Sequence, residues 1–257
     1  MLLLYSLIFA DEQAEAVCKF IVYYLYKMSN NFLVDFQKIK LVGDVTTVNS
    51  KNNLICLHGG GGDRKRFEKM RSILAEKGIW SCAFDFIGHG ETGGEIIGSS
   101  LKERVEQAVA VIDSQILSSP ISIIASSMGG YVAILLTKIY NVENLILIAP
   151  AVYTSKVYDV PFGLEFTKII REPYSWLESD SWEILKNYKG NLLIISAEKD
   201  QIIPDEVIKK IYNSAQNTKS RKIIEIKEAT HPLVKWLNEN QEDLQEVSDS
   251  IYKLLSD

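Results

Sequence analysis

From about residue 32 to its end, the chain alternates between short apolar runs and longer helical patterns. A short run that is apolar throughout predicts a strand buried on both faces, and apolar residues three or four positions apart predict a helix. Residues 32–48, with Gly43-Asp44 near their middle, predict a β-hairpin. The other predicted strands are residues 53–57, 80–84, 121–125, 145–149, 192–196 and 222–227. The predicted helices are residues 64–77, 101–117, 131–140, 205–213 and most of 232–255.

This alternation predicts a doubly wound α/β fold, with a mostly parallel sheet, helices on both faces and an antiparallel hairpin at the N-terminal edge. The length of 257 residues suits one domain, residues 32–257, with a modest insertion. Ligands of such sheets bind at the carboxyl ends of the strands. The turns that follow the predicted strands are therefore the expected place of a functional site.

A turn of small residues follows the predicted strand 121–125. Residues 125–129 form A-x-S-x-G, close to the G-x-S-x-G pattern in which a tight strand-to-helix turn pushes a serine hydroxyl out above the sheet. Ser126 competes with Ser127, but Met128 lies two residues beyond Ser126, whereas Gly129 lies two beyond Ser127. This register predicts Ser127 as a nucleophile. The alternative interpretation is a Ser/Gly-rich turn without chemistry.

Four glycines follow the predicted strand 53–57, within His58-Gly59-Gly60-Gly61-Gly62-Asp63. Glycines allow backbone conformations closed to other residues, and their N–H groups are suited to stabilise a developing oxyanion. We expect the backbone N–H groups of Gly60 and Met128 to form an oxyanion hole. A phosphate-binding loop is the rival interpretation, although neither GxxxxGK[ST] nor GxGxxG occurs here. His58 is expected to bond the loop backbone and to be structural.

A serine nucleophile needs a base, and the base needs an acid that orients it. Asp200 follows the strand 192–196, and His231 follows the strand 222–227. Ser127, Asp200 and His231 thus occur in the expected order, each beyond the carboxyl end of a predicted strand. We predict that they form a catalytic triad. Glu198, in the same loop as Asp200, is the alternative acid.

From about residue 32 to its end, the chain resembles the α/β-hydrolase superfamily, especially its monoacylglycerol lipase-like and serine aminopeptidase-like branch. The resemblance rests on residues 127–130 (SMGG) and on residues 85–92 (DFIGHGET), which are similar to the D-x-x-G-H-G-x-S loop of that branch, with Thr92 for serine. The loop is structural in that family, so Asp85 and His89 are not assigned to chemistry. The resemblance implies the α/β-hydrolase fold and hydrolysis of an ester, thioester or amide without a cofactor.

Residues 151–190 interrupt the alternation, at a place where α/β-hydrolases commonly carry a cap over the active site. The aromatic residues of this segment either bury the insertion against the domain or line an apolar acyl or aromatic pocket. A short cap implies an open site for small or medium acyl groups. The aromatic residues are Tyr153, Tyr158, Phe162, Phe166, Tyr174, Trp176 and Trp182.

Charge and composition narrow the range of partners. The net charge of −5 opposes nucleic-acid binding, and the densest basic cluster, Arg64-Lys65-Arg66, is interpreted as a solvated helix face. Three scattered cysteines without a CxxC pattern favour a reducing, cytoplasmic compartment over a disulfide framework. The three histidines belong to no metal-binding pattern, so neither a metal nor a cofactor is expected.

Residues 1–31 are predicted to be a helical N-terminal extension. Residues 2–10 are apolar like the core of a signal peptide, but no Lys or Arg precedes them. No apolar run reaches the roughly 18 residues of a membrane span. The extension is a candidate for packing on the domain, self-association or contact with a membrane surface, and Met28 is an alternative start. The oligomeric state stays open.

The sequence therefore predicts a carboxylesterase-like serine hydrolase that acts on a small-molecule ester or acyl substrate through an acyl-enzyme. An acyl-thioesterase, a monoacylglycerol lipase or a small-peptide aminopeptidase would use the same triad. The alternative from another class is a non-catalytic α/β-hydrolase-like binding module.

Overall fold

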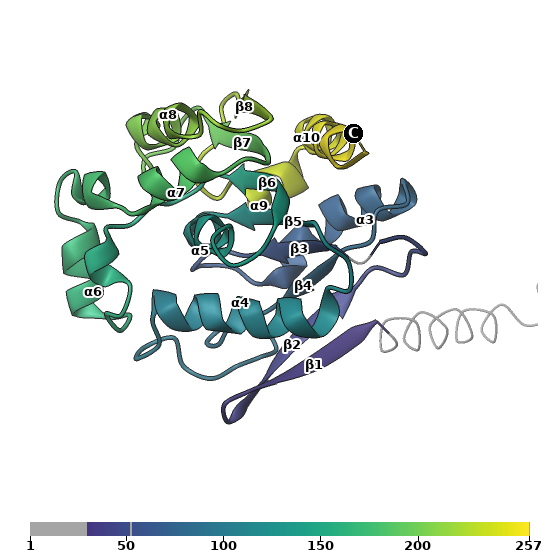
Figure 1. The fold of residues 1–257 in the computed structure, drawn as a ribbon, viewed down its shortest axis with the longest axis horizontal. Coiled ribbons are helices and arrows are strands. Elements are labelled where there is room, and N and C mark those ends of the chain that lie inside the picture. The colour runs from purple at the N-terminus through teal and green to yellow at the C-terminus, as the bar shows by residue number, and fades with distance from the viewer. Residues whose placement is uncertain (1–29, 52, 257) are drawn as a thin grey trace, which may run out of the picture.

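The computed structural model describes residues 30–51 and 53–256, and the predictions made for residues 1–29 lie outside it. In these described residues, eight strands form one sheet in the order β1-β2-β4-β3-β5-β6-β7-β8 (Figure 1). β2 is antiparallel to both of its neighbours, and every other neighbouring pair is parallel. In chain order the strands are β1 (Asn31–Phe36), β2 (Ile39–Val45), β3 (Leu54–Leu57), β4 (Cys82–Phe84), β5 (Ile121–Ser126), β6 (Val142–Ile148), β7 (Asn191–Ala197) and β8 (Ser220–Ile226).

Helices cover both faces of the sheet, as the sequence predicts. α4, α5, α7 and α8 pack on one face, and α3, α9 and α10 pack on the other. The α-helices are α3 (Glu68–Glu76), α4 (Leu101–Gln115), α5 (Met128–Leu136), α6 (Leu164–Ile170), α7 (Ser181–Asn187), α8 (Asp205–Ser214), α9 (Leu233–Glu239) and α10 (Gln241–Ser256). The 3₁₀ helices of the described part of the chain are η1 (Arg64–Phe67), η2 (Ser155–Val157) and η3 (Ser175–Glu178).

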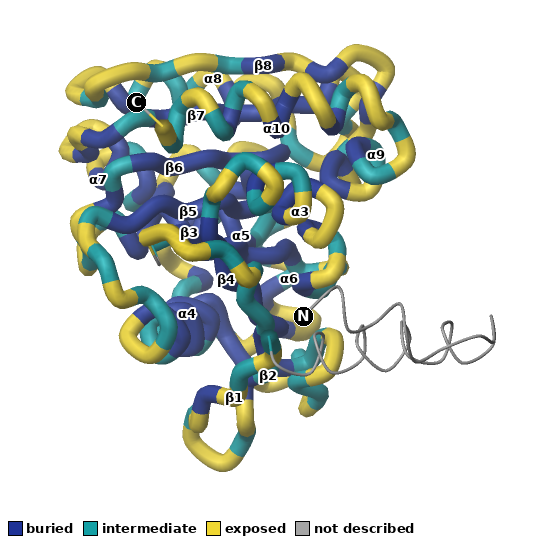
Figure 2. Tube along the Cα trace, turned by 90° about the vertical axis from the view of Figure 1, so that its right-hand side faces the viewer, coloured by how far each residue is buried: buried dark blue, intermediate teal, exposed yellow. Residues whose placement is uncertain are grey.

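The two-residue period of the strands explains the two layers of core. In β5, Ile123 and Ala125 pack toward α4 and α5, whereas Ile124 packs on the opposite face with α3 and α10. A strand between two helix layers must be apolar at successive positions, which is the pattern that the sequence shows. Figure 2 shows the central strands as largely buried, while the tip of the β1–β2 hairpin is exposed.

The hairpin is confirmed, but Gly43-Asp44 do not form its turn. The turn falls at Gln37-Lys38, where Gln37 has a φ of 52°, and both Gly43 and Asp44 lie within β2. A Cβ at Gly43 would overlap the ring of Phe32 on the neighbouring strand. This glycine therefore marks a close approach between strands, which a sequence pattern does not distinguish from a turn.

The helix predicted at residues 131–140 begins earlier, at Met128, and ends at Leu136. Gly129 and Gly130 are thus helical residues, although glycine disfavours helix interiors. A Cβ at Gly129 would lie 2.5 Å from the carbonyl oxygen of Leu57, and one at Gly130 would lie 2.9 Å from Cβ of Pro150. The two glycines therefore let α5 pack closely against the ends of β3 and β6.

Within the described residues, no helix is long and apolar enough to cross a membrane. Cys56 and Cys82 lie on the neighbouring strands β3 and β4, and both are free, buried thiols. Burial raises the pKa of Cys56 to about 12, so this thiol is not a nucleophile at neutral pH.

Candidate active site

Ser127 lies on a strained turn between β5 and α5. Its φ of 49° and ψ of −120° are unusual for a residue with a side chain, and its backbone is held at both ends. The Ser127 N–H donates to the carbonyl of Ile148 at 3.0 Å, and the Ser127 carbonyl accepts from the N–H of Gly130 at 2.8 Å. This is the strand-turn-helix geometry that exposes a serine hydroxyl above a sheet.

The structure brings Ser127, His231 and Asp200 together in one hydrogen-bond chain. Ser127 Oγ lies 3.0 Å from His231 Nε2, and His231 Nδ1 lies 2.9 Å from Asp200 Oδ2. Because a carboxylate accepts, Nδ1 carries the proton and Nε2 is left to accept from the serine hydroxyl. His231 follows β8 and Asp200 follows β7, so both loops leave the carboxyl edge of the sheet beside the turn of Ser127.

The surroundings of Asp200 favour its ionised form. Burial opposes the charge, but hydrogen bonds from His231 and from the backbone N–H groups of Ile203 and Ile202 outweigh it and lower the pKa of Asp200. The two backbone donors reach Oδ1 at 2.8 and 2.9 Å and leave Oδ2 to His231. An ionised, doubly held carboxylate fixes the orientation and the tautomer of the imidazole.

The two competing candidates lie apart from this chain of hydrogen bonds. Ser126 is the last residue of β5, and Ser127 occupies the position opposite His231. The carboxylate of Glu198 accepts from the N–H of Glu228 at 2.9 Å and from Lys227 Nζ at 3.2 Å, whereas the imidazole Nδ1 contacts Asp200. Ser127 rather than Ser126, and Asp200 rather than Glu198, thus belong to the hydrogen-bond chain with His231.

The glycine loop passes directly beside Ser127. A Cβ at Gly59 would lie 2.9 Å from Cβ of Ser127, and one at Gly60 would lie 3.2 Å from Cε of Met128. Met128 is the first residue of α5, so its N–H has no acceptor within the helix. The two residues expected to supply an oxyanion hole thus lie next to each other at the nucleophile.

A pocket of about 260 Å³ opens beside Ser127 and His231. The glycine loop forms one wall of this pocket, and residues 232–234 form another. No residue of the insertion 151–190 lines it. Its lining consists of Gly59, Gly60, Gly61, Gly62, Arg66, Ser126, Ser127, Ile148, His231, Pro232, Leu233 and Val234.

Two histidines donate hydrogen bonds to backbone carbonyls of the glycine loop. His58 Nδ1 donates to the carbonyl of Gly59 at 2.7 Å, and its Nε2 accepts from the N–H of Phe86 at 3.0 Å, as the prediction of a structural role requires. Burial lowers the pKa of His58 to about 3, so it is neutral. His89 Nε2 donates to the carbonyl of Gly60 at 2.8 Å. Local sequence patterns do not predict this role of His89, because the contact joins residues 29 positions apart.

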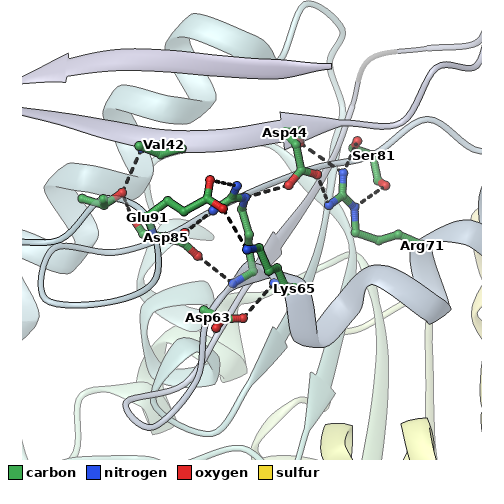
Figure 3. Close-up of polar contacts among 10 residues, drawn as sticks. Val42, Asp44, Asp63, Lys65, Arg71, Ser81, Asp85 and Glu91 are labelled. Atoms are coloured by element: carbon green, nitrogen blue, oxygen red, sulfur yellow. Dashed lines mark hydrogen bonds and ion pairs between the residues drawn. The ribbon is translucent and has the colours of Figure 1, made fainter. Parts of the chain in front are cut away.

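Arg64 and the residues around it contradict the interpretation of residues 64–66 as a solvated helix face. Arg64 is only 3% exposed, and its guanidinium contacts the carboxylates of Asp44, Asp85 and Glu91. Figure 3 shows these carboxylates converging, with Lys65 beside Glu91. The hydrogen bonds of Lys65 and Arg64 lower the pKa of Glu91 to about 2 and keep it ionised.

This ion-pair network joins three segments that are distant in sequence. Asp85 Oδ1 accepts from the N–H of Arg64 at 2.8 Å, directly after the glycine loop, and Asp85 Oδ2 accepts from the N–H of Glu91 at 2.8 Å. Asp44 connects the β1–β2 hairpin to this network, because it pairs with Arg64. It also pairs with Arg71 (Figure 3). Only Lys65 of the basic cluster behaves as predicted, with half of its side chain exposed.

Arg66 is a site residue that the sequence analysis missed. Its guanidinium Nη2 donates to the carbonyl of Gly61 at 2.6 Å, and its side chain lines the pocket beside Ser127. The sequence signal for this role is weak. Arg66 lies on the first turn after the glycine loop, and the glycines have no side chains that would separate it from the pocket.

The insertion at residues 151–190 carries η2, α6, η3 and α7, and α6 lies away from the sheet at the left of Figure 1. Phe166 packs on both Tyr153 and Phe162, and Tyr153 also packs on Tyr131 of α5. Backbone hydrogen bonds of Phe162 with Ser99 and Gly98 tie the insertion to the loop before α4. Tyr153, Phe162 and Phe166 thus bury part of the insertion against the domain, whereas Tyr174 is 67% exposed.

The described part of the chain contains no group of three or more His, Cys, Asp or Glu residues arranged to hold a metal ion.

Comparison with known proteins relates this geometry to a family. Residues 48–178, just over half of the 257 residues, match the profile of the family described as serine aminopeptidase, S33. The chain belongs to this family. The matched segment contains the glycine loop and Ser127, whereas Asp200 and His231 follow it.

Among curated proteins, the S33-family chain is similar to a Mycoplasma pneumoniae protein provisionally named esterase/lipase 2. The two are 32% identical over 111 residues, which cover 42% of this chain and 41% of the relative. The chain thus matches less than half the length of this curated relative.

Solved structures show the same fold. The monoacylglycerol lipase of Paleococcus ferrophilus has a TM-score of 0.65 and 18% identity, covering 83% of this chain and 99% of the lipase. Est1E of Butyrivibrio proteoclasticus, solved with ferulic acid bound, has a TM-score of 0.67 and 18% identity, covering 88% and 100%. The S33-family chain therefore has the α/β-hydrolase fold that the sequence predicts.

Proposed function

We propose that this protein is a serine hydrolase that cleaves a carboxylic ester of a small or medium acyl group through an acyl-enzyme. The hydrogen-bond chain from Ser127 through His231 to Asp200 carries the proposal, because it supplies a nucleophile, a base and an orienting acid in contact. A pocket of about 260 Å³ beside Ser127 supports a compact substrate.

In the first half of the reaction, Ser127 Oγ attacks the acyl carbon while His231 Nε2 takes the hydroxyl proton. The new C–O bond gives a tetrahedral intermediate, whose oxyanion accepts hydrogen bonds from the N–H groups of Gly60 and Met128. The bond to the leaving alcohol then breaks, and His231 returns the proton to the alcohol oxygen. In the second half, His231 takes a proton from water, whose oxygen attacks the acyl carbon. The bond from that carbon to Ser127 Oγ then breaks, and His231 returns the proton to Oγ, which releases the acid and restores Ser127.

The insertion 151–190 is proposed to act as a cap. Its first hydrogen bond, from the N–H of Ala151 to the carbonyl of Ser127 at 3.0 Å, places its start directly at the nucleophile. From there the chain continues through Tyr153, which packs on Tyr131 one helical turn beyond Ser127.

The first test measures hydrolysis of p-nitrophenyl esters of increasing acyl length by the wild type, Ser127→Ala and the matched control Ser126→Ala. We expect turnover and fluorophosphonate labelling of the wild type, loss of both in Ser127→Ala, and retention of labelling in Ser126→Ala. The preferred acyl length indicates the size of the site that binds the acyl group. Turnover that survives in Ser127→Ala but not in Ser126→Ala would show that the nucleophile is misassigned.

Asp200→Asn tests the orienting acid. An asparagine amide favours the wrong imidazole tautomer, so we expect kcat to fall by about 10³–10⁴-fold with the fold intact. Glu198→Gln is the matched control, because Glu198 lies in the same loop but bonds Lys227 and the N–H of Glu228. A large loss in Glu198→Gln with little effect of Asp200→Asn would reverse the assignment.

The same assays separate the alternatives. Turnover of acyl thioesters or aminoacyl amides, without turnover of oxygen esters, would favour a thioesterase or an aminopeptidase that uses the same triad. A folded wild-type protein that cleaves none of these substrates and resists fluorophosphonate would favour a non-catalytic binding module.

A further inference from the structure

Arg66 places a cation in the wall of the pocket that contains Ser127 and His231. Its side chain is half-buried against the glycine loop, where a Cβ at Gly62 would lie 2.9 Å from Cδ and Nε of Arg66. Its position is fixed at both ends: Nη2 donates to the carbonyl of Gly61, and the backbone carbonyl of Arg66 accepts from Asn238 Nδ2 at 2.9 Å. The guanidinium is therefore held at the pocket.

The charge of Arg66 is uncompensated, unlike the charges of its two neighbours. Arg64 contacts three carboxylates, and Lys65 pairs with Glu91. Across residues 30–51 and 53–256, no carboxylate lies within ion-pair distance of Arg66, and no Asp or Glu lines the pocket. A fixed guanidinium without a counter-ion is suited to bind a carboxylate or a phosphate.

The position of the pocket indicates which part of a substrate occupies it. His231 returns its proton to the leaving oxygen, so the leaving alcohol lies against His231. The pocket is lined by His231 and the three residues after it, with Arg66 among the other lining residues, and by no residue of the insertion. The leaving alcohol is thus the part of the substrate that comes within reach of Arg66.

We propose that Arg66 selects esters whose leaving alcohol carries an anionic group, a carboxylate or a phosphate. This inference rests on the proposed ester hydrolysis and names its substrate class. The four glycines between His58 and Asp63 have no side chains, so no side chain of these glycines lies between the guanidinium and such a group.

The test compares matched esters that differ in one charge. The wild type is assayed with meta-acetoxybenzoate, its neutral isostere meta-acetoxybenzamide, and meta-acetoxyphenyl phosphate, each kcat/KM being divided by the alkaline hydrolysis rate of the same ester. We expect the anionic esters to be preferred by about tenfold, the effect of one charge-assisted hydrogen bond. The ratio between benzoate and phosphate identifies the preferred anion.

Variants assign the preference to Arg66. Arg66→Gln is expected to bring the ratio of anionic to neutral ester close to one, and Arg66→Lys is expected to keep part of it. Lys65→Gln, which removes the same charge one residue away, is expected to keep the wild-type ratio. If Arg66→Gln does not fold, the ratio of anionic to neutral ester is compared between Arg66→Lys and Lys65→Gln, and equal ratios in the two variants would contradict the inference.

Three results would overturn the inference while leaving the proposed function intact, provided the neutral ester is cleaved. The first is a wild-type ratio near one, and the second is a preference that survives in Arg66→Gln. The third is a preference only for p-nitrophenyl hydrogen succinate over p-nitrophenyl butyrate, two esters whose difference in charge lies on the acyl side. Absence of turnover with every ester, together with no fluorophosphonate labelling of Ser127, would overturn the proposed function and the inference with it.

Discussion

At the residue scale, Arg104 is a buried charge that opposes folding. It is 1% exposed, and within the described chain its Nε and Nη1 have no hydrogen-bond partner. The rings of Phe86 and Phe162, 4.8 and 5.1 Å from the guanidinium carbon, offset part of the lost hydration. Burial lowers the pKa of Arg104 to about 10, so at neutral pH the charged form is less stable in the folded than in the unfolded protein.

The polar contact of Arg104 points to the active site. Its Nη2 lies 3.4 Å from Nδ1 of His89, whose Nε2 holds the carbonyl of Gly60. Nδ1 of His89 also lies 3.2 Å from the carbonyl oxygen of Ile87, a closer contact than the one with Arg104. Arg104 therefore lies beside His89, which contacts the glycine loop, and its guanidinium is buried there between two aromatic rings.

Replacing Arg104 with methionine should separate its effect on stability from its effect on catalysis. Arg104→Met removes the buried charge and keeps most of the apolar volume, so we expect the free energy of unfolding to rise by about 1 kcal/mol. The ester kcat should fall because His89 loses the side chain that lies beside its ring. Urea unfolding and ester kinetics measure the two effects, with Lys102→Met on the exposed face of α4 as the control. A loss of stability in Arg104→Met would mean that the ring contacts outweigh the cost of burial.

At the element scale, the loop at residues 85–92 is shaped by its contacts with Asp85. Thr92 Oγ1 donates to the carbonyl of Asp85 at 2.6 Å and accepts from the N–H of Val42 at 2.8 Å, which fastens the loop to β2. Gly90 has a φ of 47°, and a Cβ there would overlap the Asp85 carboxylate. The loop thus needs glycine at this position for space as well as for backbone conformation.

Gly93 provides a matched control for Gly90. It also has a positive φ, of 64°, but a Cβ there would meet no atom within 4 Å. We expect Gly93→Ala to cost about 1 kcal/mol, the backbone strain alone. Gly90→Ala should cost about 3 kcal/mol or more, because it also displaces a buried carboxylate from Arg64. Equal losses in the two variants, measured by thermal or urea unfolding, would show that Asp85 tolerates the added methyl group.

At the scale of the whole molecule, the ion-pair network around Arg64 connects the N-terminal hairpin to the active-site edge of the sheet. Asp44 belongs to β2, Arg64 follows the glycine loop, and Asp85 follows β4. The network therefore fixes the glycine loop relative to a strand two positions away in the sheet. Removing one member would leave the charge of its partner buried.

Arg64→Met is expected to destabilise the protein by about 3–5 kcal/mol, because Asp85 is fully buried and would lose its counter-ion. Lys65→Met, the adjacent control, should change the free energy of unfolding by less than about 0.5 kcal/mol, because its pair with Glu91 is exposed. Urea unfolding at neutral pH compares the two. Similar effects of both variants would mean that Arg64 contributes no more than a surface charge.

Local patterns in the sequence determined the strands, the helices and the placing of the candidate triad. Strands between two helix layers must be apolar throughout, and the carboxyl ends of parallel strands meet at one edge. Ser127, Asp200 and His231 each follow such a strand, so their proximity could be expected before their distances were known. The glycine loop and the small-residue turn could also be recognised in the sequence, because each depends on a few consecutive residues.

The tertiary structure alone decided what depends on contacts between distant residues. Arg64, Lys65 and Arg66 are consecutive and chemically alike, yet one is buried among carboxylates, one is exposed and one lines the pocket. Gly43 resembles a turn glycine in the sequence, but it lies in β2 because Phe32 packs over it. Local propensity and periodicity carry no information on such neighbours, since the environment of a charge or of a glycine is set by segments that folding brings together.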